Sequence, residues 1–135
     1  MKIKICGSMA FSREMIEAKK RLDSMGHAAE IPCDAVTVAE GLYDNTDMEA
    51  DFEHCVKNDV IRKDLKSLSE CDAILVLNYP KNGINGYIGA STLMEIGLAY
   101  HLGLKIFLLN KPPPVEKARY SHELRIINPV VLYGS

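Results

Sequence analysis

Apolar residues occur along this chain in two patterns: short continuous runs, and longer stretches in which they recur every three or four residues. The continuous runs at 2–6, 73–78 and 105–110 are typical of strands in a parallel sheet that is buried on both faces. A weaker run at 27–32 predicts another strand, and 129–134 predicts a last one. Strands are therefore expected along the whole chain.

Helical spacing predicts helices over 12–26 and 88–102, and a short helix within 115–127. Ser12 is of a type that caps helix N-termini, and Gly26 follows the last periodic residue, where glycine often ends a helix. We therefore expect the first helix to begin at Ser12 and to stop at Gly26.

A longer periodic stretch predicts a single helix over 47–69. Residues 33–46, which precede it, contain turn-forming residues and are predicted to be irregular. The long helix carries an apolar stripe that we expect to be buried: Met48, Phe52, Val56, Ile61, Leu65 and Leu68.

Strands and helices alternate along the chain, which predicts an α/β fold. We expect one domain over 1–135, with a doubly wound parallel sheet of about five strands. In such sheets ligands bind outside the carboxyl ends of the strands. The loops at 7–12 and 79–91 should therefore carry the function.

Net charge and the distribution of apolar residues give information about the partners that this protein could bind. The net charge of −2 gives no indication of a nucleic-acid or membrane-surface partner, and no apolar run has the length of a membrane span. The N-terminal residues do not read as a secretory signal. We expect a reduced, cytoplasmic protein without a disulfide framework or zinc site, because its four cysteines form no C-x-x-C pair: Cys6, Cys33, Cys55 and Cys71.

Glu95 is the one carboxylate in the otherwise apolar helix predicted over 88–102. Ser91 and Thr92 share its helix face, so a narrow polar stripe lies near the N-terminus of this helix. The N–H groups of a first turn favour the ionised form of a nearby carboxylate, and a rigidly held carboxylate can act as a nucleophile. The alternative is a solvated or ion-paired glutamate without a chemical role.

The loop before this helix is rich in glycine. Gly83, Gly86 and Gly89 let a backbone approach a ligand closely, although turn geometry explains them equally well. Their spacing matches neither a dinucleotide nor a triphosphate motif. We take Gly86 and Gly89 as candidate substrate-binding residues, together with Asn78 at the end of the preceding strand.

The segment CGSMAFSR follows the first strand and leads into a helix. Gly7 and Ser8 occupy a natural site for an anion or a sugar hydroxyl, and Cys6 is taken as a substrate-binding candidate beside them. The low-molecular-weight cysteine phosphatases begin with C-x5-R. Here six residues separate Cys6 from Arg13, which disfavours that alternative.

Asp64 borders the apolar stripe of the long predicted helix, whereas a surface aspartate more often lies opposite such a stripe. Solvation at the edge of the stripe, or an ion pair with a nearby Lys or Arg, would also explain it. His54 lies on the same predicted helix and is taken as structural or exposed.

Several of these segments, in this order, resemble the nucleoside 2-deoxyribosyltransferase superfamily, which includes the 2′-deoxynucleoside 5′-phosphate N-hydrolases. The most specific are Asp64-Leu65 within IRKDLKSLSECDAILVLN, before a buried strand, and Glu95-Ile96-Gly97 after the glycine-rich loop. The CGS sequence after the first strand adds to them. The likeness covers nearly the whole chain in element order and extends to small uncharacterised prokaryotic members.

The resemblance implies a flavodoxin-like or Rossmann-like sheet, no metal or organic cofactor, and a homodimer or larger homo-oligomer in which a partner subunit completes the active site. It implies that Glu95 attacks the anomeric carbon of a deoxyribosyl group, and that Asp64 orients the substrate and manages protons. Gly7 and Ser8 match the sugar or 5′-phosphate end of the site. Ser91 matches a small or hydroxyl residue before the nucleophile.

This chain departs from the family in the loop before the nucleophile. It has Asn78, Asn82 and Asn85 where transferases of the family often carry an aspartate, and its C-terminal segment has no arginine cluster for a phosphate. The resemblance therefore leaves open the base, the need for a 5′-phosphate, and whether water or a second base accepts the sugar.

The sequence thus predicts cleavage or transfer at the N-glycosidic bond of a nucleoside or its 5′-monophosphate, through a glycosyl-Glu95 intermediate. Two alternatives remain. One is a binding module for nucleosides or nucleotides that keeps the pocket without turnover. The other is cleavage of the nicotinamide–ribose bond of NAD, which a lone glutamate on such a sheet would also suit.

Overall fold

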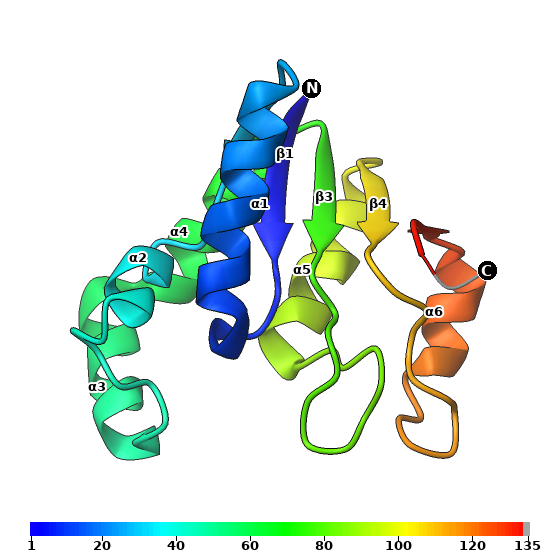
Figure 1. The fold of residues 1–135 in the computed structure, drawn as a ribbon. Helices are drawn as coiled ribbons and strands as arrows, with labels where there is room; N and C mark the ends of the chain where they lie inside the picture. Colours follow the sequence, from blue (N-terminus) through cyan, green and yellow to red (C-terminus); the bar gives the residue numbers. More distant parts are fainter. Residues whose placement is uncertain (134–135) are drawn as a thin grey trace.

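The computed structural model describes residues 1–133 and contains a five-stranded sheet between two layers of helices (Figure 1). All four strand pairs are parallel, in the order β2-β1-β3-β4-β5, which is the flavodoxin-like order. The predicted doubly wound α/β fold is confirmed. The strands are β1 (Lys2–Cys6), β2 (Ala28–Glu30), β3 (Ala73–Val76), β4 (Lys105–Leu108) and β5 (Val130–Val131).

Two clusters of buried residues, one on each face of the sheet, form the core. On one face β1 and β3 pack against α1 and α2, and on the other face against α4, α5 and α6. Figure 1 shows α1 in front of the sheet and α5 behind it. The helices are η1 (Met9–Phe11), α1 (Ser12–Ser24), α2 (Ala35–Ala39), α3 (Met48–Asn58), α4 (Val60–Ser69), α5 (Ala90–His101) and α6 (Ser121–Ile127).

The register of β1 and β3 sets the position of the functional loops. Cys6 pairs with Val76, so the two central strands end at the same level. The loop after β1 and the glycine-rich loop after β3 therefore leave the sheet side by side at its carboxyl edge, as predicted for a ligand site. Helix α5 begins where the second of these loops ends.

The start of the first helix differs from the prediction. Ser8, not Ser12, provides a capping side chain: its Oγ accepts a hydrogen bond from the N–H of Ala10 at the start of η1. Ser12 is buried within the first turn of α1. Helix α1 ends at Ser24, close to the predicted end at Gly26, and Gly26 is in the left-handed region at φ +91°.

The predicted single helix over 47–69 is wrong, because it is two helices. Asp59 has left-handed dihedral angles, φ 51° and ψ 46°, and separates α3 from α4. The expected burial of the apolar stripe is also wrong for its first half, since the exposed fractions of Met48, Phe52 and Val56 are 85%, 63% and 65%. Leu68, at the other end of the stripe, is fully buried.

Two further predicted boundaries change. Residues 33–46 are not wholly irregular, because they contain the short helix α2, anchored by the buried Ala35. The last strand is shorter than predicted, and Gly134 at the end of its predicted range lies outside the described residues. None of the helices within 1–133 combines the length and the apolar character that crossing a membrane requires.

Candidate active site

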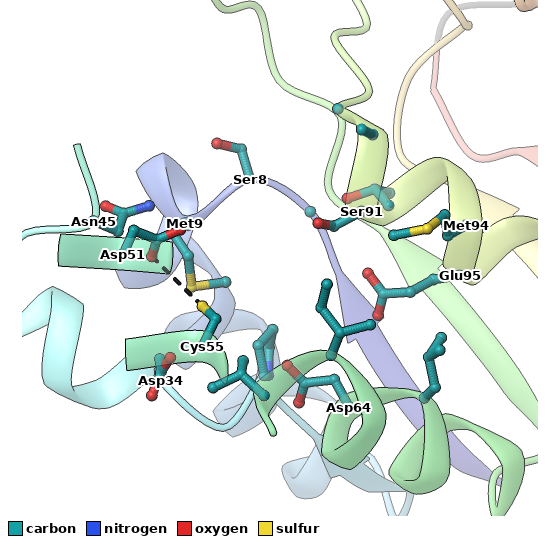
Figure 2. Close-up of a pocket in the computed structure, with 18 of the residues that line it drawn as sticks. Ser8, Met9, Asp34, Asn45, Asp51, Cys55, Asp64, Ser91, Met94 and Glu95 are labelled. Atoms are coloured by element: carbon teal, nitrogen blue, oxygen red, sulfur yellow. Dashed lines mark hydrogen bonds between the residues drawn. The ribbon is translucent and has the colours of Figure 1, made fainter. Parts of the chain in front are cut away.

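A cleft of about 810 Å³ opens at the carboxyl edge of the sheet. Its walls are the loop after β1, helices α3 and α4, and the first half of α5. Figure 2 shows Glu95 and Ser91 on one side of the cleft and Asn45, Asp51 and Cys55 on the opposite side. Six of the residues singled out from the sequence line this cleft: Gly7, Ser8, Asp64, Gly89, Ser91 and Glu95.

Glu95 is half-buried in the α5 wall. Its pKa is raised from the ordinary 4.5 to about 7, first by burial and further by the negative charge of Asp64. A hydrogen bond from the Cys6 thiol and the positive charge of Lys4 act in the opposite direction. A substantial fraction of Glu95 is therefore protonated near neutral pH.

The expectation that the helix N-terminus keeps Glu95 ionised is therefore wrong. Helix α5 begins at Ala90, so Glu95 lies more than one turn from the N–H groups that carry the partial positive charge. That effect falls off within the first turn, whereas partial removal of the carboxylate from water is the largest cause of the raised pKa at this position.

Asp64 projects from α4 into the same cleft (Figure 2). Its Oδ1 accepts hydrogen bonds from the backbone N–H of Cys33, at 3.0 Å, and from Lys4 Nζ, at 3.2 Å. Asp64 is thus both an ion-paired residue and a wall of the cleft, so the two interpretations of the sequence are compatible.

Lys4 is a component of this site that the sequence analysis missed. It lies in the middle of β1, its side chain is only 1% exposed, and its Nζ also donates to Ser67 Oγ at 3.2 Å and to the Ile31 carbonyl oxygen at 3.4 Å. The sequence did contain an indication of this role, because Lys4 is at the centre of KIKIC, in a strand predicted to be buried on both faces.

Three candidate substrate-binding residues lie outside the cleft wall. Cys6 is fully buried, and burial raises the pKa of its thiol well above the ordinary value, so it stays protonated beside Glu95. Asn78 is fully buried and hydrogen-bonds Asn110. Gly86 is buried where an added Cβ would overlap the carbonyl oxygen of Lys111. Their positions indicate packing roles and not direct substrate contact.

A second lysine reaches the cleft from the glycine-rich loop. Lys81 Nζ donates to Ser8 Oγ at 2.9 Å and lies 5.0 Å from the centre of the Tyr87 ring. The N-cap of α5, Gly89, makes no side-chain capping hydrogen bond. A cation and a hydroxyl of the cleft wall therefore lie together at Ser8, where an anionic group would be stabilised.

The opposite wall is a linked group of polar and aromatic side chains. His54 stacks on Tyr43 with ring centroids 4.3 Å apart, and its Nε2 lies 3.1 Å from Asp34 Oδ2. The hydroxyl of Tyr43 donates to Asp51, which also accepts from the thiol of Cys55. The interpretation of His54 as structural agrees with these contacts. His54 does not itself line the cleft, but it contacts Asp34 and Tyr43, which do, and the predicted helix pattern gave no indication of this.

Within residues 1–133, no group of three or more His, Cys, Asp and Glu side chains is placed to hold a metal ion. The acidic residues of the cleft instead contact lysine, histidine, tyrosine, thiol or backbone donors.

Comparison with known proteins shows a likeness in fold. No protein-family model and no curated protein sequence matches the chain. The structure of the CMP N-glycosidase BcmB of Clostridium botulinum matches with a TM-score of 0.54 and 18% identity, over 100% of this chain and 89% of that one. The 2-deoxyribosyltransferase of Leishmania mexicana matches with a TM-score of 0.54 and 20% identity, over 86% of this chain and 69% of that one. The resemblance inferred from the sequence is thus confirmed for the fold: this chain folds like an N-glycosidase and a deoxyribosyltransferase.

Proposed function

We propose that this protein cleaves or transfers at the N-glycosidic bond of a nucleoside, a deoxynucleoside or the corresponding 5′-monophosphate, with Glu95 as the nucleophile. The observation that carries the proposal is the placement of two carboxylates, Glu95 on α5 and Asp64 on α4, in one cleft at the carboxyl edge of the sheet. The similarity in fold to an N-glycosidase and a deoxyribosyltransferase supports it.

In the first step, ionised Glu95 donates an electron pair to the anomeric carbon while the bond from that carbon to the base nitrogen breaks. The bonding pair leaves with the base, and the sugar passes through an oxocarbenium-like transition state. The product is a glycosyl ester of Glu95. Since the pKa of Glu95 is raised to about 7, the reactive form becomes more abundant as pH rises through neutrality.

Asp64 is the proposed partner for proton transfer. When protonated it gives its proton to the nitrogen of the departing base, and in the second step it accepts a proton from the water or incoming base that attacks the glycosyl ester. That attack breaks the ester bond and returns the electron pair to Glu95. The contacts of Asp64 with Lys4 and with the Cys33 N–H fix its orientation toward the cleft during both steps.

The proposal is tested by incubating the protein with 2′-deoxynucleosides, ribonucleosides, their 5′-monophosphates and NAD, with and without a second free base. Chromatography then detects released base or exchanged nucleoside. We expect turnover of at least one nucleoside or nucleotide and its loss in Glu95→Ala. Turnover that survives this substitution would exclude Glu95 as the nucleophile.

One observation favours a second candidate, a binding module. A protonated Glu95 can donate a hydrogen bond to a ligand without attacking it, and the raised pKa makes this form common at neutral pH. Calorimetric titration of nucleosides into Glu95→Gln distinguishes the two: a binding module keeps its affinity and shows no turnover in the wild type.

We further propose that the protein is a homo-oligomer. Exposed apolar side chains of α3 and α5 meet at the mouth of the cleft, namely Met48, Phe52, Val56 and Met94, and a second copy of the chain that covered them would also close the cleft. Sedimentation velocity of the wild type and of Phe52→Glu tests this. We expect the wild type to sediment as a dimer or larger assembly and the variant to dissociate.

A further inference from the structure

Strand β1, which is paired on both sides within the sheet, contains a buried charge. Lys4 is 1% exposed and lies on the face of β1 that also carries Cys6, because side chains two apart in a strand point the same way. On that face the neighbours of Cys6 in the core are apolar side chains of β3, α4 and α5. A buried cation within such a core is costly unless it is paired and hydrogen-bonded.

The Lys4 ammonium has three polar contacts, one of which is with a residue of the cleft wall. It donates to Asp64, to Ser67 on the same helix, and to the Ile31 carbonyl oxygen at the end of β2. Two of these acceptors lie on α4, one turn apart, so the ammonium fixes the face that α4 presents to the sheet. Of the two, Asp64 is the one that lines the cleft.

The second carboxylate of the cleft is linked to the same strand. Glu95 lines the same cleft as Asp64, and the charged groups that act on its pKa are Asp64 of α4, which raises it, and Lys4 of β1, which lowers it. Without Lys4, the carboxylates of Asp64 and Glu95 would face the cleft without this cation, and like charges in a partly dry place oppose each other's ionisation.

A purely structural ion pair is a weaker explanation. Replacing a buried ion pair by apolar residues of similar size is often neutral or stabilising, so stability alone does not account for a lysine at this position. Lys4 instead pairs with Asp64, which lines the same cleft as Glu95, and this placement indicates a role in the site.

Building on the proposed function, we propose that Lys4 is a positioning residue of the active site: it holds Asp64 at the cleft wall and supplies the positive charge that lets Glu95 ionise beside it. Lys4 itself does not touch the substrate, since its ammonium is enclosed by protein acceptors.

The first test does not depend on activity. The carboxyl carbons of Glu95 and Asp64 are followed by NMR during a pH titration of the wild type and of Lys4→Met, which keeps the length of the side chain and removes its charge. We expect the midpoint of Glu95 to move to higher pH by about one unit when the cation is lost. Lys105→Met is the matched control, because Lys105 is an exposed lysine at the start of β4, and it should leave both midpoints in place.

Should Lys4→Met alone fail to fold, the comparison is made in an Asp64→Asn background, where no carboxylate is left unpaired. The midpoint of Glu95 in Asp64→Asn is then compared with that in Lys4→Met/Asp64→Asn. A higher midpoint in the double variant supports the proposal, and identical midpoints overturn it.

The second test uses a substrate found by the chromatographic assay. We expect Lys4→Met to lower kcat by about 100-fold with little change in KM, and to shift the rising limb of the pH–rate profile to higher pH. An unchanged limb would overturn the role of Lys4. If no substrate is turned over at all, the proposed function fails, and the NMR titration still decides whether Lys4 governs Glu95.

Discussion

The side chain of Asn78 and the backbone of Asn110 hydrogen-bond each other in both directions. Asn78 Nδ2 donates to the Asn110 carbonyl oxygen at 2.8 Å, and the Asn110 N–H donates to Asn78 Oδ1 at 2.9 Å. This pair joins the chain just after β3 to the chain just after β4, because each asparagine follows the end of its strand. The glycine-rich loop therefore starts from a fixed point on the sheet.

We predict that Asn78→Ala lowers the free energy of unfolding by about 2–3 kcal/mol, because it leaves partly buried backbone groups at Asn110 without their partner. Urea denaturation measures this change. Asn85→Ala in the exposed part of the same loop is the control and should change stability by less than about 0.5 kcal/mol. A stable Asn78→Ala variant with impaired substrate binding would instead restore the sequence-based role of Asn78.

Two glycine substitutions are expected to change stability in opposite directions, one because the backbone at Gly86 requires glycine and the other because Gly97 lies in a helix where alanine is favoured. Gly86 has φ +71° and no room for a Cβ beside Lys111, so Gly86→Ala should destabilise the protein by about 1–3 kcal/mol from backbone conformation alone. Gly97 lies within α5 with nothing near its missing Cβ, so Gly97→Ala should stabilise by about 0.5–1 kcal/mol. Thermal unfolding followed by circular dichroism gives both signs, and equal effects of the two changes would contradict this account of Gly86.

The raised pKa of Glu95 predicts a dependence of stability on pH. Because the folded protein holds this proton more tightly than the unfolded chain, the stabilisation is complete below pH 4.5 and is lost as pH rises through about 7. Glu95→Gln has no such loss. It should therefore be more stable than the wild type at pH 8, by up to about 3 kcal/mol, and gain little at pH 4.

Urea denaturation of the wild type and Glu95→Gln at both pH values checks this prediction. Glu116→Gln, at an exposed position, is the matched control and should show no difference between the two pH values. A gain of equal size at pH 4 and pH 8 would show that Glu95 is not the titrating group.

Lys81 provides a test for recognition of a 5′-phosphate. Its ammonium donates a hydrogen bond to Ser8 in the cleft wall, so Lys81→Met should raise KM for nucleoside 5′-monophosphates by roughly 10- to 100-fold. KM for the unphosphorylated nucleosides should change little. Lys117→Met, at an exposed lysine, is the control for general charge. Equal effects on nucleosides and monophosphates would place the phosphate elsewhere or remove it from the substrate.

Much of the fold could be predicted because its strands are continuous apolar runs. The runs that contain Ile5 and Ile74 are buried on both faces, and only a central parallel strand explains such runs together with alternating helices. The break at Asp59 could not be predicted in this way. A left-handed aspartate leaves the apolar spacing almost intact, so α3 and α4 read as one helix.

The site was predictable where a residue contradicts its surroundings. Glu95 is a carboxylate in an apolar helix. Lys4 is a cation in an apolar strand and could have been identified as a candidate site residue in the same way. The stacking of His54 on Tyr43 of the cleft wall could not be predicted, because it depends on how the segment around α2 folds against α3. The apolar stripe of α3 was misinterpreted because helical spacing shows that one face is apolar, and not what that face contacts.

The proposed mechanism requires that Glu95 form a covalent bond with the sugar. The direct measurement is the intact mass of the protein after incubation with a 2-fluoro-2-deoxy nucleoside, in which the fluorine slows hydrolysis of the glycosyl ester, followed by peptide mapping. We predict a mass increase of one fluorodeoxyribosyl group, located on Glu95 and absent from Glu95→Gln. Release of base without any adduct, and at the same rate in Glu95→Gln, would contradict the account.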